Sequence, residues 1–181
     1  MHHHTHPDPE VALLVEQCTA ALTTMRHPTD DWVRQAASGR LPVGLTGPLP
    51  CDARKLAAVV NRLCDEQAFG QALPAALMLA SRDPDNAQYA FLLATCLQRV
   101  GQPAAALMMF GMAGLHGGSA YAAAATFRSG ECLAAMGRTD EAIAVFDTAI
   151  EASRQDPTLT PLQRLAESKA EALRAHRSGS P

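Results

Sequence analysis

Apolar positions in the middle of the chain recur in two matching blocks, each with the spacing of amphipathic helices. Residues 96–114 (CLQRVGQPAAALMMFGMAG) align with residues 132–150 (CLAAMGRTDEAIAVFDTAI) at an offset of 36 positions. A weaker copy lies 34 positions upstream of the first block, where Leu63 takes the place of Leu97. Each copy predicts two helices of about a dozen residues joined by a short turn. The residues that agree between the two blocks are Cys96 with Cys132, Leu97 with Leu133, Gly101 with Gly137, Ala106 with Ala142, Phe110 with Phe146 and Ala113 with Ala149.

A period of this length, with small and large residues at set places, is typical of tetratricopeptide repeats. Ala106 and Ala142 allow the two helices of a repeat to approach closely, and Phe110 fills the gap to the next repeat. Gly101 and Gly137 supply turns in which the backbone needs a positive φ. The sequence therefore predicts an all-α tetratricopeptide-repeat solenoid. Its three helix-turn-helix repeats are expected at 53–86, 87–120 and 123–156, with two extra residues in a loop at Gly117 and Gly118.

An apolar stripe before the repeats predicts an N-terminal helix that opens at Asp8 and Pro9. The stripe either folds back on the first repeat or meets its copy in a homodimer. We expect a weak homodimer, because the first helix pair of a solenoid needs a cover. The residues predicted for this contact are Val11, Leu14, Val15, Cys18 and Leu22.

Thr160, Pro161 and Gln163 are arranged as a capping box at the start of a C-terminal helix that runs to about Ala175. We expect this helix to cap the last repeat. The histidine-rich start of the chain is interpreted as a disordered tail or a tag remnant. The predicted divisions are 1–7 for this tail, 8–50 for the N-terminal helical extension and a Pro/Gly linker, 51–156 for the repeats, and 157–181 for the capping helix and a disordered tail.

The composition argues against several functions. The net charge of −3 with no basic block argues against direct binding of nucleic acid. Five cysteines without a CxxC pair favour reduced thiols over a disulfide framework or a metal site. The chain lacks a phosphate-binding loop, an HExxH motif and a nucleophile elbow, so we expect neither an enzyme nor a cofactor.

The stretch from Val100 to Phe127 carries no charged residue. Its uninterrupted apolar part, residues 104–115, has the length of a buried helix and is too short to span a bilayer. We therefore expect a tightly packed core helix and no membrane insertion.

Three segments carry a resemblance to a known family: NRLCDEQAFGQA at 61–72, LATCLQRVGQPAAAL at 93–107 and GECLAAMGRTDEAI at 130–143. Over roughly residues 30–153 the chain resembles the class II chaperones of bacterial type III secretion systems, of the SycD/LcrH type. The resemblance implies three repeats preceded by a helical extension. It also implies a cytoplasmic bacterial protein that binds hydrophobic translocator proteins before export. The expected contact is an extended Pro-x-Leu-x-x-Pro segment in a concave groove. Some members also dock an AraC-like activator.

In this fold the first helix of each repeat lines the groove. Phe91 and Phe127 are expected to offer flat surfaces for proline and leucine, and polar neighbours to satisfy the backbone of the partner segment. The predicted groove residues are Asn61, Cys64, Gln88, Phe91, Thr95, Gln98, Phe127 and Glu131.

The same fold also serves other functions. A carboxylate-clamp co-chaperone needs five polar residues in the groove, of which only Asn61 and Arg128 are present. A general repeat scaffold of another secretion or pilus apparatus stays an alternative. For the linker at residues 39–50, a stiff spacer is the expected role, and occupation of the groove in the absence of a partner is a second hypothesis.

Overall fold

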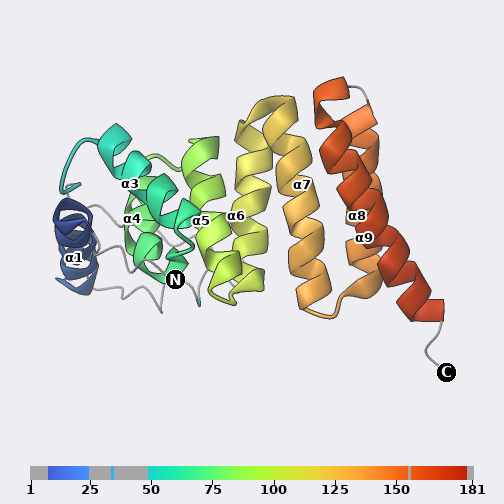
Figure 1. The fold of residues 1–181 in the computed structure, drawn as a ribbon, viewed down its shortest axis with the longest axis horizontal. Coiled ribbons are helices and arrows are strands. Elements are labelled where there is room, and N and C mark those ends of the chain that lie inside the picture. The colour runs from blue at the N-terminus through green and yellow to red at the C-terminus, as the bar shows by residue number, and fades with distance from the viewer. Residues whose placement is uncertain (1–7, 25–33, 35–48, 155, 179–181) are drawn as a thin grey trace, which may run out of the picture.

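The computed structural model describes residues 8–24, 34, 49–154 and 156–178. Within these residues every regular element is helical, and the helices stand side by side in a row from α1 at one end to α9 at the other (Figure 1). This arrangement confirms the predicted all-α repeat solenoid. The elements are α1 (Pro9–Thr24), α3 (Ala53–Asp65), α4 (Phe69–Arg82), α5 (Ala87–Arg99), α6 (Pro103–His116), α7 (Gly118–Ala135), α8 (Thr139–Arg154), the 3₁₀ helix η1 (Pro157–Leu159) and α9 (Thr160–Ser178).

The turn inside each helix pair has the same backbone design. The second residue after the first helix of each pair has a positive φ, which is 60° at Gln67, 81° at Gly101 and 74° at Gly137. The next backbone N–H then donates to a carbonyl near the helix end, as in the 2.8 Å bond from Gln102 to Leu97. Gln67 is the one non-glycine residue with a positive φ among the described residues, and this conformation costs a side chain about 1 kcal/mol.

Small residues let the paired helices touch, as the repeat pattern predicts. Ala106 and Ala142 are fully buried, and so are the rings of Phe110 and Phe146. Gly130 marks a close approach of α7 and α8, because a Cβ at this position would lie 2.7 Å from the Phe146 ring. The solenoid core is therefore built from alternating small and large side chains on successive helices.

The prediction of a loop insertion at Gly117 and Gly118 is wrong. Helix α6 ends at His116 and α7 already begins at Gly118, five residues before the repeat phase of 123. The reversal is this tight because Gly118 has a φ of 70° and because Gly117 has no room for a side chain: a Cβ there would lie 2.3 Å from Cβ of Tyr121. The extra residues therefore lengthen α7 at its start. None of the described helices is long and apolar enough to cross a membrane.

Helix α1 packs against α4 and covers the first repeat. Of its predicted stripe, Val11, Leu14, Cys18 and Leu22 are buried within the chain and Val15 is partly buried. This burial corrects the prediction that the stripe forms a homodimer, because the chain itself occupies these side chains.

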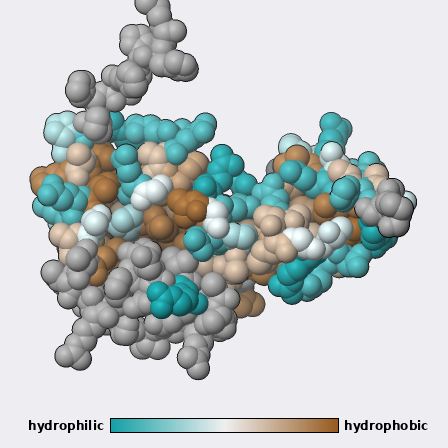
Figure 2. Space-filling model, turned by 90° about the horizontal axis from the view of Figure 1, so that it is seen from below, coloured by the Kyte–Doolittle hydropathy of each residue, from teal (hydrophilic) through white to brown (hydrophobic). Residues whose placement is uncertain are grey.

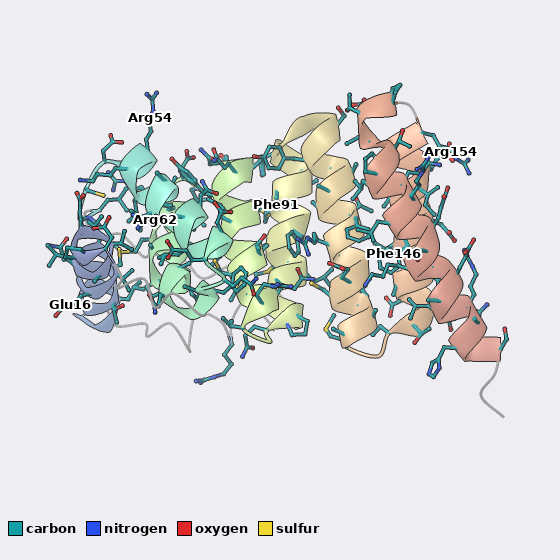
Figure 3. The ribbon with its side chains drawn as sticks, in the orientation of Figure 1. Glu16, Arg54, Arg62, Phe91, Phe146 and Arg154 are labelled. Carbon is teal, nitrogen blue, oxygen red and sulfur yellow. The ribbon has the colours of Figure 1, made fainter. Side chains whose placement is uncertain are left out.

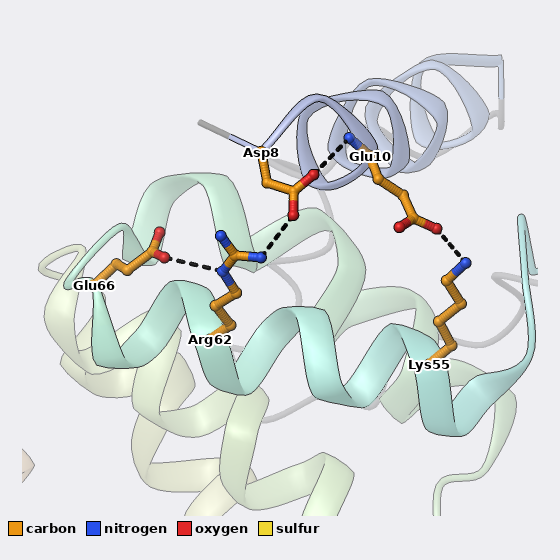
Figure 4. A network of polar contacts seen from close by, with 5 residues as sticks. All are labelled: Asp8, Glu10, Lys55, Arg62 and Glu66. Carbon is orange, nitrogen blue, oxygen red and sulfur yellow. Dashed lines mark hydrogen bonds and ion pairs between the residues drawn. The ribbon is translucent and has the colours of Figure 1, made fainter. Parts of the chain in front are cut away.

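Ion pairs tie the start of α1 to α3 (Figure 4). Arg62 donates to Asp8 over 2.8 Å and to Glu66 over 3.1 Å, and Lys55 pairs with Glu10. These side chains are between 36% and 61% exposed, so water screens the pairs and each adds little to stability. The apolar stripe is therefore the main force that holds α1 in place.

Helix α9 covers the last repeat, with Ala166 and Ala170 fully buried. The predicted capping box is wrong. The Thr160 hydroxyl donates to the carbonyl of Pro157, and the Gln163 amide donates to Glu167. Asp156 instead accepts from the backbone N–H of Thr158 and starts η1, which leads into α9 without a break. Residues 1–7 and 39–48, which hold the predicted tail and most of the linker, lie outside the described residues.

Candidate peptide-binding site

The concave side of the repeats holds a cavity of about 450 Å³ between α3, α5 and α7, here called the central cavity. Figure 2 shows the outline of the molecule hollowed between its two ends. Five predicted groove residues come together in this cavity, and four residues that were not predicted for it complete the wall. The predicted ones are Asn61, Cys64, Gln88, Phe91 and Thr95, and the others are Leu92, Tyr121, Ala124 and Arg128.

The Phe91 ring lies near the middle of the helix row and is partly buried (Figure 3). Its edge meets the Phe110 ring with centroids 5.2 Å apart and the Tyr121 ring with centroids 5.8 Å apart. Edge-to-face contacts on two sides hold the Phe91 ring in one orientation. The cavity therefore offers a preformed aromatic surface, which suits a flat apolar side chain such as proline.

Some hydrogen-bonding groups in the central cavity are already used within the chain, and others are available to a partner. The Thr95 hydroxyl donates its proton to the carbonyl of Phe91 over 2.9 Å, so toward a partner it can only accept a hydrogen bond. Asn61 and Gln88 are exposed at the rim. These side chains can pair with the backbone of an extended segment but cannot enclose a small ligand.

Gln98 and Glu131 lie in a second cavity of about 710 Å³, here called the polar cavity. Arg128 lines both cavities, which therefore adjoin. Glu131 is surrounded by donors: Arg128 at 2.9 Å, Gln98 at 3.3 Å and Lys169 of α9 at 3.7 Å. The full lining is Gln67, Phe69, Gln98, Arg99, Arg128, Glu131, Ala134, Phe146, Lys169, Ala172 and Leu173.

The prediction that Phe127 lies in the groove is wrong. Its side chain is only 4% exposed, and its ring packs 5.5 Å from that of Phe146. Phe127 matches Phe91 in the repeat, but at this end of the solenoid α9 closes over the repeat. Ala166 and Ala170 of α9 belong to the same apolar cluster as Phe127.

Sequence reasoning missed Tyr121 and the contribution of α9. Tyr121 lies in the lengthened start of α7, before residue 123, at which the repeat pattern places the start of the third repeat. One sequence signal could have indicated Tyr121 as a cavity residue: it is an aromatic residue that follows soon after the paired glycines. No periodicity in the sequence predicts that Lys169 reaches the concave side, because the cap is not a copy of the repeat.

Two cysteine thiols meet beside the central cavity, where Sγ of Cys64 lies 3.7 Å from Sγ of Cys96. The hydrogen bond from Cys96 lowers the pKa of Cys64, and the same bond, together with burial, raises the pKa of Cys96. Burial raises the pKa of Cys18 to about 11 and that of Cys132 to about 12. Cys64 is therefore the thiol most inclined to ionise. Across the described residues no cluster of side chains is arranged to hold a metal ion.

Comparison with known proteins supports the fold. A family model described as anaphase-promoting complex, cyclosome, subunit 3 matches residues 65–149. No match to a curated protein sequence was found. Among solved structures, the translocator chaperone SycD of Yersinia enterocolitica is 19% identical, with a TM-score of 0.65 over 69% of this chain and 85% of SycD.

PcrH from Pseudomonas aeruginosa is 22% identical, with a TM-score of 0.62 over 71% of this chain and 96% of PcrH. PcrH in complex with the chaperone-binding region of PopD is also 22% identical, with a TM-score of 0.64 over 68% of this chain and 92% of that chain. The resemblance read from the sequence is thus confirmed in the fold. This chain has the tetratricopeptide-repeat fold of the type III secretion translocator chaperones.

Proposed function

We propose that this protein is a cytoplasmic chaperone of a bacterial type III secretion system. It binds hydrophobic translocator proteins through the concave side of its repeats and keeps them soluble and apart before export. The observation that carries the proposal is the central cavity, in which Phe91 and Tyr121 present fixed aromatic surfaces beside exposed amide side chains. An extended segment with alternating apolar residues matches such a surface.

The structural neighbours add support. SycD is described in complex with a peptide of the translocator YopD, and PcrH in complexes with the chaperone-binding regions of PopD and PopB. The partner expected here is a hydrophobic translocator that carries a Pro-x-Leu-x-x-Pro segment. Docking of an AraC-like activator remains a prediction from the family resemblance, with no described contact to support it. A weak homodimer through a surface other than the buried stripe also remains a prediction, and a structure of SycD is described as an alternative dimer.

Replacing Phe91 with alanine is expected to weaken binding of a labelled peptide, such as Gly-Pro-Ala-Leu-Ala-Ala-Pro-Gly, by about 1–3 kcal/mol, as for other central interface aromatics. Fluorescence anisotropy measures the change. Tyr89→Ala is the matched control, because Tyr89 is also partly buried on α5 but lines neither cavity. Melting curves verify that both variants fold. Equal affinity of Phe91→Ala and the parent would show that the central cavity is not the binding site.

Co-expression separates the proposed chaperone from a general repeat scaffold. A translocator with a transmembrane hairpin is expected in the soluble fraction with the parent and in the pellet with Phe91→Ala. A scaffold would bind the peptide and still leave the translocator insoluble.

The thiol of Cys64 gives an independent readout of the central cavity. We expect iodoacetamide to modify Cys64 about tenfold faster than Cys18 and Cys132 at pH 7.5, because alkylation requires the thiolate. A saturating Pro-x-Leu-x-x-Pro peptide should protect Cys64 and leave the rate at Cys51 unchanged, since Cys51 lies outside the cavity. Mass spectrometry of proteolytic digests follows each site. An unchanged rate at Cys64 with bound peptide would place the peptide elsewhere.

A further inference from the structure

The polar cavity carries more positive than negative charge. Its lining includes Arg99, Arg128 and Lys169 but only one carboxylate, that of Glu131. Arg128 and Lys169 both face this carboxylate, at 2.9 Å and 3.7 Å. Charge balance alone therefore leaves room for further negative charge in the cavity.

Arg99 is a cation without a carboxylate partner among the described residues. Its guanidinium stacks 5.0 Å from the centre of the Phe69 ring, a contact that holds the side chain in place and leaves its N–H groups available. Next to Arg99 in the sequence, Oε1 of Gln98 is buried and has no hydrogen-bond partner among the described residues. The buried oxygen is closed to a ligand, so the cavity presents Arg99 as its unpaired group.

The rest of the lining makes this polar cluster stronger than one at an open surface. Phe146, Leu173 and Ala134 form apolar walls, and the side chain of Glu131 is only 21% exposed. Apolar walls reduce the screening of charges by water. Lys169, Ala172 and Leu173 belong to α9, so the capping helix supplies one side of the cavity.

The polar cavity adjoins the central cavity at Arg128, so one extended chain can enter both. The charge of the whole protein does not favour an acidic partner, because its net charge is −3. Any preference for acidic residues must therefore come from these local cations.

We propose that the polar cavity binds an acidic side chain that flanks the apolar motif in the same partner segment. Arg99 and Lys169 attract its carboxylate. This inference rests on the proposed function, since the apolar motif has to occupy the central cavity. It adds a rule for partner choice: an apolar segment next to Asp or Glu binds more tightly than one next to neutral or basic residues.

The test uses labelled peptides that share the Pro-Ala-Leu-Ala-Ala-Pro core and have amidated C-termini. One peptide carries three glutamates before the core and a second carries three glutamates after it. Each has a matched peptide with three glutamines at the same positions. One glutamate peptide is expected to bind the full-length protein about fivefold more tightly than its glutamine partner at low salt, the size of one good partly exposed ion pair. The gain should shrink in 0.5 M NaCl.

Lys169→Glu is expected to abolish the gain and to leave binding of the glutamine peptides unchanged. Arg164→Glu is the matched control. This substitution changes the charge of α9 by the same amount, but Arg164 does not line the polar cavity. It should keep the gain. If it loses the gain as Lys169→Glu does, the effect is long-range and the site is wrong.

The outcomes separate the two proposals. Equal affinity of all four peptides for the parent would overturn the acidic rule and leave the groove intact. A gain that survives in Lys169→Glu would remove the polar cavity from the explanation. Failure of every peptide to bind would overturn the proposed function and this inference with it. The same peptides made with a free C-terminal carboxylate form a second set, and a gain seen only in that set would show recognition of a chain terminus and refute the internal acidic side chain.

Discussion

Replacing Leu14 with aspartate is expected to release α1 from the repeats and to lower the free energy of unfolding by about 3 kcal/mol. Leu14 is only 6% exposed and belongs to the main apolar cluster, in which α1 packs against α4. A carboxylate at this place has to be either desolvated without a partner or exposed by undocking of the helix, and both routes are costly. Thermal unfolding and limited proteolysis within α1 measure the loss.

Leu13 offers the matched control, because it is the next residue on the same helix and is 53% exposed. Leu13→Asp should leave the melting temperature within about 1 °C of the parent, since exposed substitutions change stability very little. Light scattering of both variants adds the oligomeric state. A dimer lost in Leu13→Asp with unchanged stability would place an interface on the outer face of α1. Normal stability of Leu14→Asp would contradict the role of α1 as a cap.

Replacing Gly130 with valine is expected to destabilise the third repeat by about 3 kcal/mol, at the upper end of the cost of overpacking. A Cβ at Gly130 already lies 2.7 Å from the Phe146 ring, and the two valine methyl groups add to the clash. The ring has little space to retreat, because Phe146 is 1% exposed and packs against Phe127. Denaturant unfolding measures the change.

Gly111 is the control for backbone effects in this experiment. It also lies within a helix, α6, but a Cβ added there meets nothing within 4 Å. Gly111→Val should therefore change stability by no more than about 0.5 kcal/mol, the difference in helix propensity between the two residues. Similar losses in both variants would mean that helix propensity, and not the contact with Phe146, explains the effect at Gly130.

The repeat itself could be predicted because its contacts are local. Each helix of a solenoid packs mainly on the helices next to it, so the need for small residues at Ala106 and Ala142 and for large ones at Phe110 and Phe146 appears as a period in the sequence. The turns at Gly101 and Gly137 could be predicted for a similar reason, since a positive φ is a property of one residue. Five groove residues were found by the same register.

The ends of the solenoid were decided by tertiary structure. Phe91 and Phe127 hold the same place in the repeat, yet Phe91 lines the central cavity and Phe127 is buried, because α9 joins the apolar cluster around Phe127. The sequence predicts the apolar stripe of α1. The same pattern, however, results whether the stripe covers the first repeat of its own chain or meets a second copy of the chain. Only the folded chain shows that it covers its own, and only the folded chain brings Lys169 beside Glu131. Periodicity reports which face of a helix is buried; which element covers that face depends on contacts between residues far apart in the sequence.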